Sequence, residues 1–392
     1  MLCLLSGCGR SPQPPTTTPI SSPPASLPVT STPAASAAAS ALPHPRPTSP
    51  ADASYARALE AAQQGQLPRA LQLLEENTRR YPRHVAFWQL LADVAHDTGQ
   101  SDRELETCRQ LSRLQPRNVE NLIRLGNLYL QLEWYQQAEP LFRRALQLAP
   151  DDIQAIIGQV SYWYVVNTPR KSVDLLRRAI TRYPTNDQLY HALAENYRRL
   201  GDFAHAEDAA RQGLRINPGN ARLYKELAQV LISSQNVKRL PEAEQALRRT
   251  LQVQPDDFDS LYLLATVVED QGRAAEAQQL YESVARVPSE TNPALYRLGR
   301  LYLKQGRRAD GQALIARYEQ ATHRRDAADD IRKRLWKGGT AADHLAMARY
   351  YQQQGDLSRA RIEAQRALEL DPREAEARRL LQALRTQRKT GH

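Results

Sequence analysis

The chain has 392 residues and a formal net charge of +10, from 53 Lys and Arg against 43 Asp and Glu. From residue 51 onward it is rich in Ala, Leu, Gln, Arg and Glu, which favour helices, and it lacks the alternating apolar and polar runs of a β-sheet protein. Its three cysteines include two in the first eight residues, which excludes a disulfide framework or a cysteine zinc site in the body. The basic residues are interspersed with acids, so we expect a mixed-charge coat and no nucleic-acid partner.

The first eight residues read MLCLLSGC. The segment Leu5–Cys8 resembles the lipobox of bacterial lipoproteins, in which a peptidase cuts before a cysteine that then carries acyl chains. The resemblance implies lipidation at Cys8, and Gly9 in place of Asp implies sorting to an outer membrane. A signal peptide needs a basic start and an apolar stretch of about 7–15 residues, whereas residues 1–8 are short and lack Lys and Arg. We therefore expect residues 1–8 to be a truncated signal whose true start lies upstream; the alternative is a chance Leu-rich beginning.

Residues 9–50 contain 12 prolines among Ser, Thr and Ala, with no acidic residue. This composition predicts a disordered, semi-extended tether. A tether directly after a lipidated cysteine is typical of proteins held at an envelope membrane.

Five prolines stand 34 residues apart, which is the period of paired-helix repeats: Pro82, Pro116, Pro150, Pro184 and Pro218. The clearest unit, 119–152, carries large and small apolar residues at helical spacing: Leu122, Leu125, Gly126, Tyr129, Ala138, Phe142 and Ala145. The pattern resembles the tetratricopeptide repeat, and the resemblance covers residues 51–374. It implies an all-α protein, a right-handed α-α superhelix whose units pack on their neighbours to form an open spiral.

The same spacing divides the chain into nine units and a cap. Eight repeats occupy 51–325, a connector helix is expected at 326–340, a ninth repeat lies at 341–374, and 375–392 is a capping helix and tail. The sixth unit has three extra residues around Ser234–Arg239. The basic run 331–337 has two interpretations, a patch for an acidic partner or anionic lipid, or a helix whose apolar residues fill the stack; the pattern favours the second.

No catalytic constellation is visible. The histidines of the body lie in different units, and neither a phosphate-binding glycine loop nor a zinc-protease motif is present. Cys108 takes the place of a large apolar residue, which predicts a buried thiol. We therefore expect a non-enzymatic protein with no cofactor and no metal.

The family resemblance implies that first helices line a concave groove for protein or peptide partners. The residues expected to face it include two tyrosines proposed as anchors and five polar residues: Tyr262, Tyr296, Arg300, Lys225, His191, Glu195 and Asn127. Simple solvent exposure is the alternative for each. Asn127 matches one part of the clamp with which some family members hold a peptide carboxylate, but Ile123 stands where its lysine would be, so binding of chaperone tails is not expected.

Three functional hypotheses follow. The first is a scaffold tethered to a bacterial envelope membrane, facing the periplasm and assisting assembly of a pilus, secretion or polymer-export complex. The second is a cytoplasmic adaptor with the same fold. The third is a ligand-binding or enzymatic lipoprotein whose site the sequence does not reveal.

Overall fold

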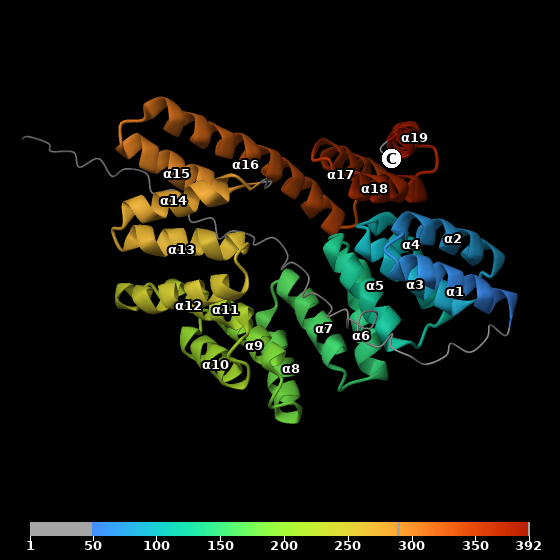
Figure 1. Cartoon of the computed structure of the whole chain (residues 1–392), viewed down its shortest axis with the longest axis horizontal. Helices are drawn as coiled ribbons and strands as arrows, with labels where there is room; N and C mark the ends of the chain where they lie inside the picture. The colour runs from blue at the N-terminus through green and yellow to red at the C-terminus, as the bar shows by residue number, and fades with distance from the viewer. Residues whose placement is uncertain (1–48, 288–290, 391–392) are drawn as a thin grey trace, which may run out of the picture. The chain divides into compact units, whose positions relative to one another are not determined.

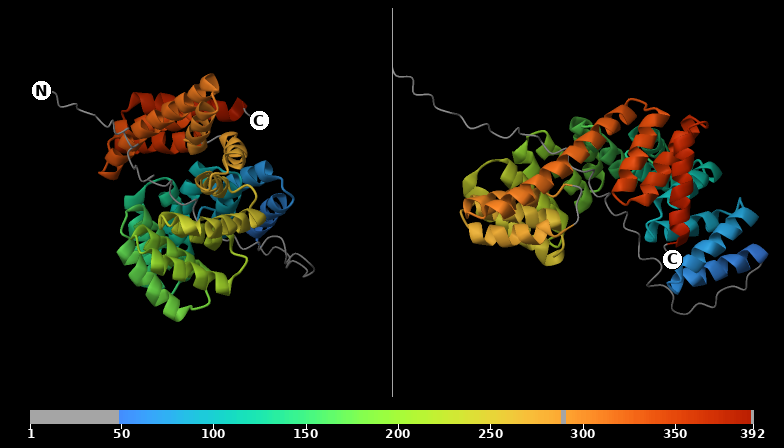
Figure 2. Two further views of the ribbon diagram at one scale, coloured as in Figure 1. Left: turned by 90° about the vertical axis from the view of Figure 1, so that its left-hand side faces the viewer. Right: turned by 90° about the horizontal axis from the view of Figure 1, so that it is seen from above.

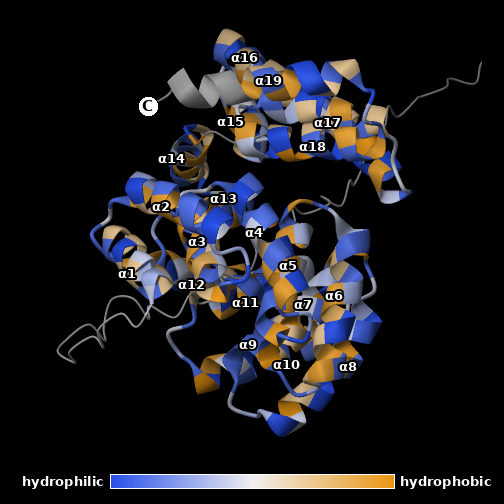
Figure 3. Ribbon diagram, turned by 90° about the vertical axis from the view of Figure 1, so that its right-hand side faces the viewer, coloured by the Kyte–Doolittle hydropathy of each residue, from blue (hydrophilic) through white to orange (hydrophobic). Residues whose placement is uncertain are grey.

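The computed structural model describes residues 49–287 and 291–390. The predicted lipidation site Cys8, the signal 1–8 and nearly all of the tether 9–50 lie outside these ranges. Within them no strand occurs, and the helices pair into tandem hairpins (Figure 1). Polar and apolar segments alternate along the helices in Figure 3, as expected for helices that bury one face. The predicted all-α repeat fold is confirmed.

Each of the nine hairpins has a first and a second helix. The first helices are α1 (Pro50–Gln63), α3 (Val85–Asp97), α5 (Val119–Gln131), α7 (Ile153–Val165), α9 (Asp187–Arg199), α11 (Ala221–Ser233), α13 (Phe258–Asp270), α15 (Pro293–Lys304) and α17 (Ala341–Gln353). The second helices are α2 (Leu67–Arg80), α4 (Ser101–Leu114), α6 (Tyr135–Leu148), α8 (Pro169–Arg182), α10 (Phe203–Ile216), α12 (Leu240–Val253), α14 (Ala274–Ala285), α16 (Arg308–Trp336) and α18 (Leu357–Leu370). Helix α19 (Ala375–Thr390) follows the ninth hairpin and packs on α18.

The periodic prolines lie between the second helix of one repeat and the first helix of the next. Helix α4 ends at Leu114, two residues before Pro116, because proline cannot donate the hydrogen bond that would continue the helix. Two residues further on, the Asn118 side chain accepts a hydrogen bond of 3.0 Å from the Asn121 backbone N–H and caps α5. Asp, or Asn, follows the next three prolines at the same distance and caps α7, α9 and α11 in the same way. The sequence motif thus ends one hairpin and starts the next.

The hairpins interlock through large residues seated against glycines. The Phe142 side chain of α6 is fully buried. A Cβ atom placed on Gly126 of its own repeat would lie 2.8 Å from the Phe142 ring, and one on Gly158 of the next repeat would lie 2.3 Å from it. The small residues therefore create the space that lets one ring join two repeats.

The turn between the paired helices needs a left-handed backbone. Gly201, at this turn in the fifth repeat, has φ of +76°, a conformation that glycine adopts without steric cost. At the same place in the third, fourth and sixth repeats stand Glu133, Asn167 and Gln235, with φ of 62°, 55° and 54°. For a residue with a Cβ, the left-handed conformation costs roughly 1–2 kcal/mol of conformational energy, and the cost is smallest for Asn.

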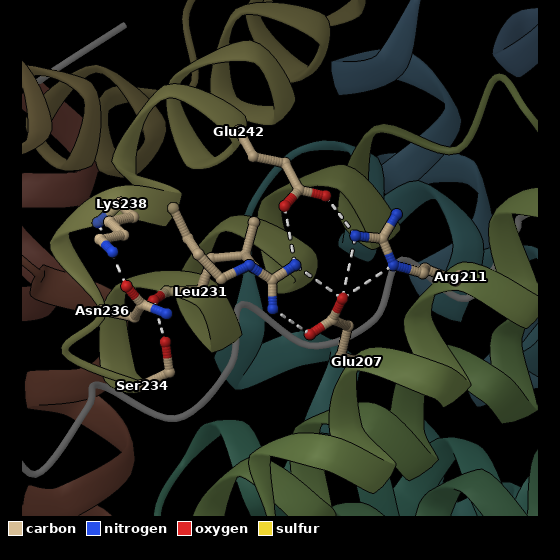
Figure 4. Close-up of polar contacts among 8 residues, drawn as sticks. Glu207, Arg211, Leu231, Ser234, Asn236, Lys238 and Glu242 are labelled. Carbon is tan, nitrogen blue, oxygen red and sulfur yellow. Dashed lines mark hydrogen bonds and ion pairs between the residues drawn. The ribbon is translucent and has the colours of Figure 1, made fainter.

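The three extra residues of the sixth unit form a short 3₁₀ helix, η1 (Val237–Arg239), anchored by ion pairs (Figure 4). Arg239 donates hydrogen bonds of 2.6 and 2.8 Å to Glu207 of α10 and one of 2.7 Å to Glu242 of α12. Arg211 contacts the same two glutamates and completes a quartet. A second quartet, Glu244, Arg248, Arg273 and Glu276, joins the sixth and seventh repeats. The insertion therefore leaves the joint between repeats intact.

The expected separate connector at 326–340 is not present as such. Residues 308–336 form one continuous helix, α16, because no proline or turn signal interrupts it before Gly338, where φ is +100°. Ile331 and Leu335 pack against the apolar core formed with Met347, Tyr351, Ala360 and Leu384, as the stack-filling interpretation predicts. Trp336 instead remains 40% exposed.

The C-terminal repeat also contacts repeats far from it in sequence. Helix α18 packs against α4, and Figure 1 shows the C-terminal helices next to α4, with the same neighbourhood of red and blue-green helices in Figure 2. Five residues on one side, Asp102 and Glu133–Gln136, meet Arg332, Trp336, His344 and Arg361–Glu363 on the other; we call this contact the return interface. The expectation of an open array with contacts only between neighbours is therefore wrong at this point, because period and spacing carry no information about contacts between distant repeats.

Candidate partner-binding surface

Three predicted groove residues lie on the first helices of the fifth and sixth repeats. His191 and Glu195 are half-buried and stand one turn apart on α9. One turn further, Arg198 donates a hydrogen bond of 2.6 Å from Nε to Glu226 of α11, a carboxylate that is almost fully buried. Lys225 of α11 forms ion pairs of 3.1 and 3.2 Å with Asp257 and Asp259.

The charges on α9 are perturbed by crowding. Burial, and next the like charge of Glu226, raises the pKa of Glu195 to about 7 from its usual 4.5. Burial lowers the pKa of His191 below its usual 6.5, so the imidazole is neutral at pH 7. Arg198 donates its hydrogen bond to Glu226 and not to Glu195. Glu195 is therefore the group on this surface whose charge changes most readily near neutral pH.

The two predicted anchor tyrosines belong to an aromatic cluster on the seventh and eighth repeats. Tyr262 of α13 lies 6.0 Å from the ring of Tyr281, and Tyr296 of α15 lies 5.5 Å from the ring of Tyr318. Both Tyr262 and Tyr296 are half-buried. The Arg300 guanidinium is exposed and lies 6.0 Å from the Tyr296 ring centre. Aromatic faces and an exposed arginine suit a protein contact surface.

One predicted groove residue lies apart from the others, and some neighbours of the predicted residues were not identified from the sequence. Asn127 lies on α5, two repeats before α9, and is half-buried. Arg198 stands three residues after the predicted groove residue Glu195, on the same helix face, and could have been found by extending the pattern by one turn. Tyr281, which is fully buried beneath Tyr262, and Tyr318, which is half-buried beside Tyr296, lie on second helices, and no first-helix pattern would have identified them as packing partners.

The return interface borders a cavity of about 1100 Å³. It is lined by α2, α3, α4, the start of α6 and the C-terminal helices, and its walls include Trp88, Trp134, Arg109, Arg361 and Glu369. Arginines and acids are equally represented in the lining, and several are paired with one another, as Arg103 is with Glu75 at 2.7 Å. The cavity therefore shows no preference for ligand charge.

Three further kinds of feature bear on function in the part of the chain that the structure describes: metal sites, membrane-spanning helices and reactive thiols. No cluster of His, Cys, Asp and Glu there could hold a metal ion. No helix among the described residues has the length and apolar character to span a membrane. Cys108 is buried, and burial raises the pKa of its thiol to about 12, so it is unreactive near neutral pH.

Four family models match the sequence of this chain. Three are described as tetratricopeptide repeats and match residues 55–119, 119–152 and 344–374. The fourth is described as the cytochrome c-type biogenesis protein H TPR domain and matches residues 176–295. The fold is thus a solenoid of α-hairpins, and the chain is a tetratricopeptide repeat protein.

Several solved structures resemble this chain at low sequence identity. A chain of the APC/C hetero-tetramer Cut9–Hcn1 is 15% identical with a TM-score of 0.47; the match covers 85% of this chain and spans only 63% of that one. PilF of Pseudomonas aeruginosa is 17% identical, with coverage of 52% and 90% and a TM-score of 0.45. Human IFIT1, solved as a dimer with m7Gppp-AAAA, is 14% identical, with coverage of 82% and 90% and a TM-score of 0.48. Among curated protein sequences no match was found.

Proposed function

We propose that this chain is a non-enzymatic scaffold whose first-helix faces in repeats 5 to 8 bind protein or peptide partners. The observation that carries the proposal is the aromatic cluster at Tyr262 and Tyr296, bordered by the exposed Arg300. Tyrosine and arginine contribute more to protein interfaces than most residue types do. The cluster lies on consecutive repeats, so an extended segment can contact both tyrosines along the stack.

The proposal includes a place in the cell. We propose a lipid anchor on Cys8, a tether, and repeats that face the periplasm from the outer membrane. The motif at Leu5–Cys8 and the proline-rich segment after it support this arrangement. In such a position the scaffold would assist assembly of an envelope complex such as a pilus, a secretion system or a polymer exporter. The description of the model matched by residues 176–295 names cytochrome c biogenesis, which adds maturation of that protein to the processes to test.

The partner surface is tested by reversing one exposed charge. In the native host, proximity labelling with the Arg300→Glu variant is expected to lose the main protein partner captured by the unaltered chain. Arg317→Glu is the matched control, because Arg317 is also exposed in repeat 8 but lies on the second helix. Equal capture by both variants would place the partner elsewhere, and recovery of RNA or a small molecule in place of protein would overturn the scaffold proposal.

The anchor has its own test. Intact mass of the protein from its native host is expected to show a chain beginning at Cys8 with two or three acyl groups, and fractionation to place it in the outer membrane. A cytoplasmic protein that retains an unmodified Met1 would support the adaptor hypothesis and contradict the anchor.

A further inference from the structure

The centre of the return interface is a buried polar network. The Trp134 indole donates a hydrogen bond of 2.9 Å from Nε1 to Glu363 Oε1, and Glu363 Oε2 lies 2.6 Å from His344 Nδ1. The three residues are 7%, 3% and 9% exposed. Trp134 is 229 residues away from Glu363, so this network joins the third repeat to the ninth. A carboxylate buried to this degree requires its hydrogen-bond donors.

The residue before Trp134 is held in an unfavourable conformation. Glu133 has φ of 62° at the turn position where most repeats have glycine. Its carboxylate accepts a hydrogen bond of 2.6 Å from Arg332 Nε of α16, and its side chain is only 16% exposed. Strain at a turn persists where surrounding contacts compensate for it, and here the compensating contact lies across the return interface.

The rest of the interface is also polar. Arg361 Nε donates to Asp102 at 2.9 Å, and the Gln136 amide donates to the Trp336 carbonyl at 2.5 Å. The Tyr135 and Trp336 rings lie 5.1 Å apart. From the C-terminal repeat, Ile362 alone joins the large apolar cluster of repeats 2 and 3, among the residues described.

The C-terminal repeat has its own apolar core. Met347, Tyr351, Ala360 and Leu384 form one buried cluster, with Ile331 and Leu335 of α16 against it. Two smaller clusters lie beside it, formed by Leu345, Ala367, Ala377 and by Ala348, Ala364, Leu381. A unit with its own core, attached elsewhere by a polar interface, can move relative to its neighbour while staying folded.

We propose that the return interface is a reversible clasp, from which the C-terminal unit (residues 331–384) detaches as a folded body. Charged and polar contacts close it, with Glu133 and Trp134 as the central elements. Opening separates α18 from α4. Repeats 4 to 8, which lie between the two joined parts in sequence, are then no longer held at both ends. The clasp is a property of the chain alone and does not depend on the proposed partner.

The test combines hydrogen exchange and small-angle X-ray scattering on the full chain. In the double variant Glu133→Gly with Trp134→Phe, we expect backbone exchange in α17 and α18 to accelerate on the order of tenfold and the maximum dimension to increase, with helical content unchanged. The unaltered chain in about 1 M NaCl is expected to shift in the same direction but by less, because the charge pairs of the interface are only partly exposed and salt screens such pairs weakly. Asn167→Gly is the matched control, since Asn167 also has φ of 55° and also accepts from an arginine, Arg199, but within adjacent repeats.

Two results would overturn the clasp. Scattering and exchange identical to those of the unaltered chain, in the double variant and in high salt, would show a permanent joint. A loss of helical signal in the double variant would show that the C-terminal unit does not stay folded on its own core.

Discussion

At the scale of single residues, Glu195 is the position where protonation and stability are most closely linked. The pKa of Glu195 in the folded state, about 7, lies above the ordinary value of 4.5. The protonated carboxyl therefore stabilises the folded state; this stabilisation is fully present below pH 4.5 and is lost as pH rises through 7. We expect Glu195→Gln to raise the free energy of unfolding by about 1–3 kcal/mol at pH 8 and to change it little at pH 4. Urea unfolding at the two pH values measures the difference.

Glu76→Gln is the control for this prediction. Glu76 is exposed on α2, and its replacement is expected to alter stability equally little at both pH values. If Glu195→Gln also behaves in this way, Glu195 is ionised without penalty and the proposed crowding by Glu226 is incorrect.

Gly158 tests how tightly the repeats interlock. In Gly158→Ala the new Cβ would lie 2.3 Å from the Phe142 ring, which is fully buried and has little room to move. Overpacking of this kind costs about 1–3 kcal/mol, more than the roughly 1 kcal/mol that alanine gains over glycine in a helix. Thermal unfolding should show a net loss of stability.

A comparison glycine lacks this neighbour. The Cβ of Gly219→Ala would meet only Asn217 Oδ1, at 3.6 Å, and its backbone does not have a positive φ. This variant should keep the stability of the unaltered chain. A stable Gly158→Ala protein would mean that the ring and the two adjoining helices adjust freely.

At the scale of elements, the inserted turn η1 is held by charge. Arg239→Ala removes three hydrogen bonds to Glu207 and Glu242 and is expected to lower the free energy of unfolding by about 1 kcal/mol at low salt, because these groups are partly exposed. The hydrogen bonds from Arg239 are the main cause that lowers the pKa of Glu207 to about 2. The contribution is therefore present above the ordinary pKa of 4.5 and is lost as pH falls toward 2.

Denaturant titrations at pH 7 and pH 3 check this prediction. Arg249→Ala is the control, since Arg249 is exposed on the neighbouring helix and donates only to Gln252. A loss from Arg239→Ala that is the same at pH 3 as at pH 7 would assign the effect to packing of the arginine stem instead of charge.

Local rules explain why the elements could be predicted. Proline, then Asn or Asp two residues later, acts over a few residues at the joint between hairpins, so it marks the ends and starts of the helices from α4 to α11 without information from distant repeats. The prediction was wrong at α16, where a helix continues past the period because no residue stops it before Gly338. The packing of Tyr281 and Tyr318 against the two anchor tyrosines was not predicted, because both lie on second helices and the groove pattern follows first helices only.

At the scale of the whole molecule, the return interface changes how stability is shared. In an open repeat array each unit interacts with its neighbours only, so changes in distant repeats add independently. In this chain Glu363 accepts the hydrogen bond of the buried Trp134 indole, and Ile362 packs into the apolar core of repeats 2 and 3. No periodic pattern in the sequence signals these pairs, because they depend on the accumulated geometry of all the repeats between them.

The Asp102–Arg361 pair gives a direct measure of this coupling. The two side chains are 20% and 12% exposed, 259 residues apart in sequence, and joined by hydrogen bonds of 2.9 and 3.3 Å. In a double-mutant cycle with Asp102→Ala and Arg361→Ala, we expect a coupling energy of about 1 kcal/mol in urea unfolding at low salt. The cycle of Asp102→Ala with Arg373→Ala, an exposed arginine between α18 and α19, should give none. Additive behaviour of Asp102 and Arg361 would mean that repeats 2 and 9 are energetically independent, as they would be in a chain whose ends never meet.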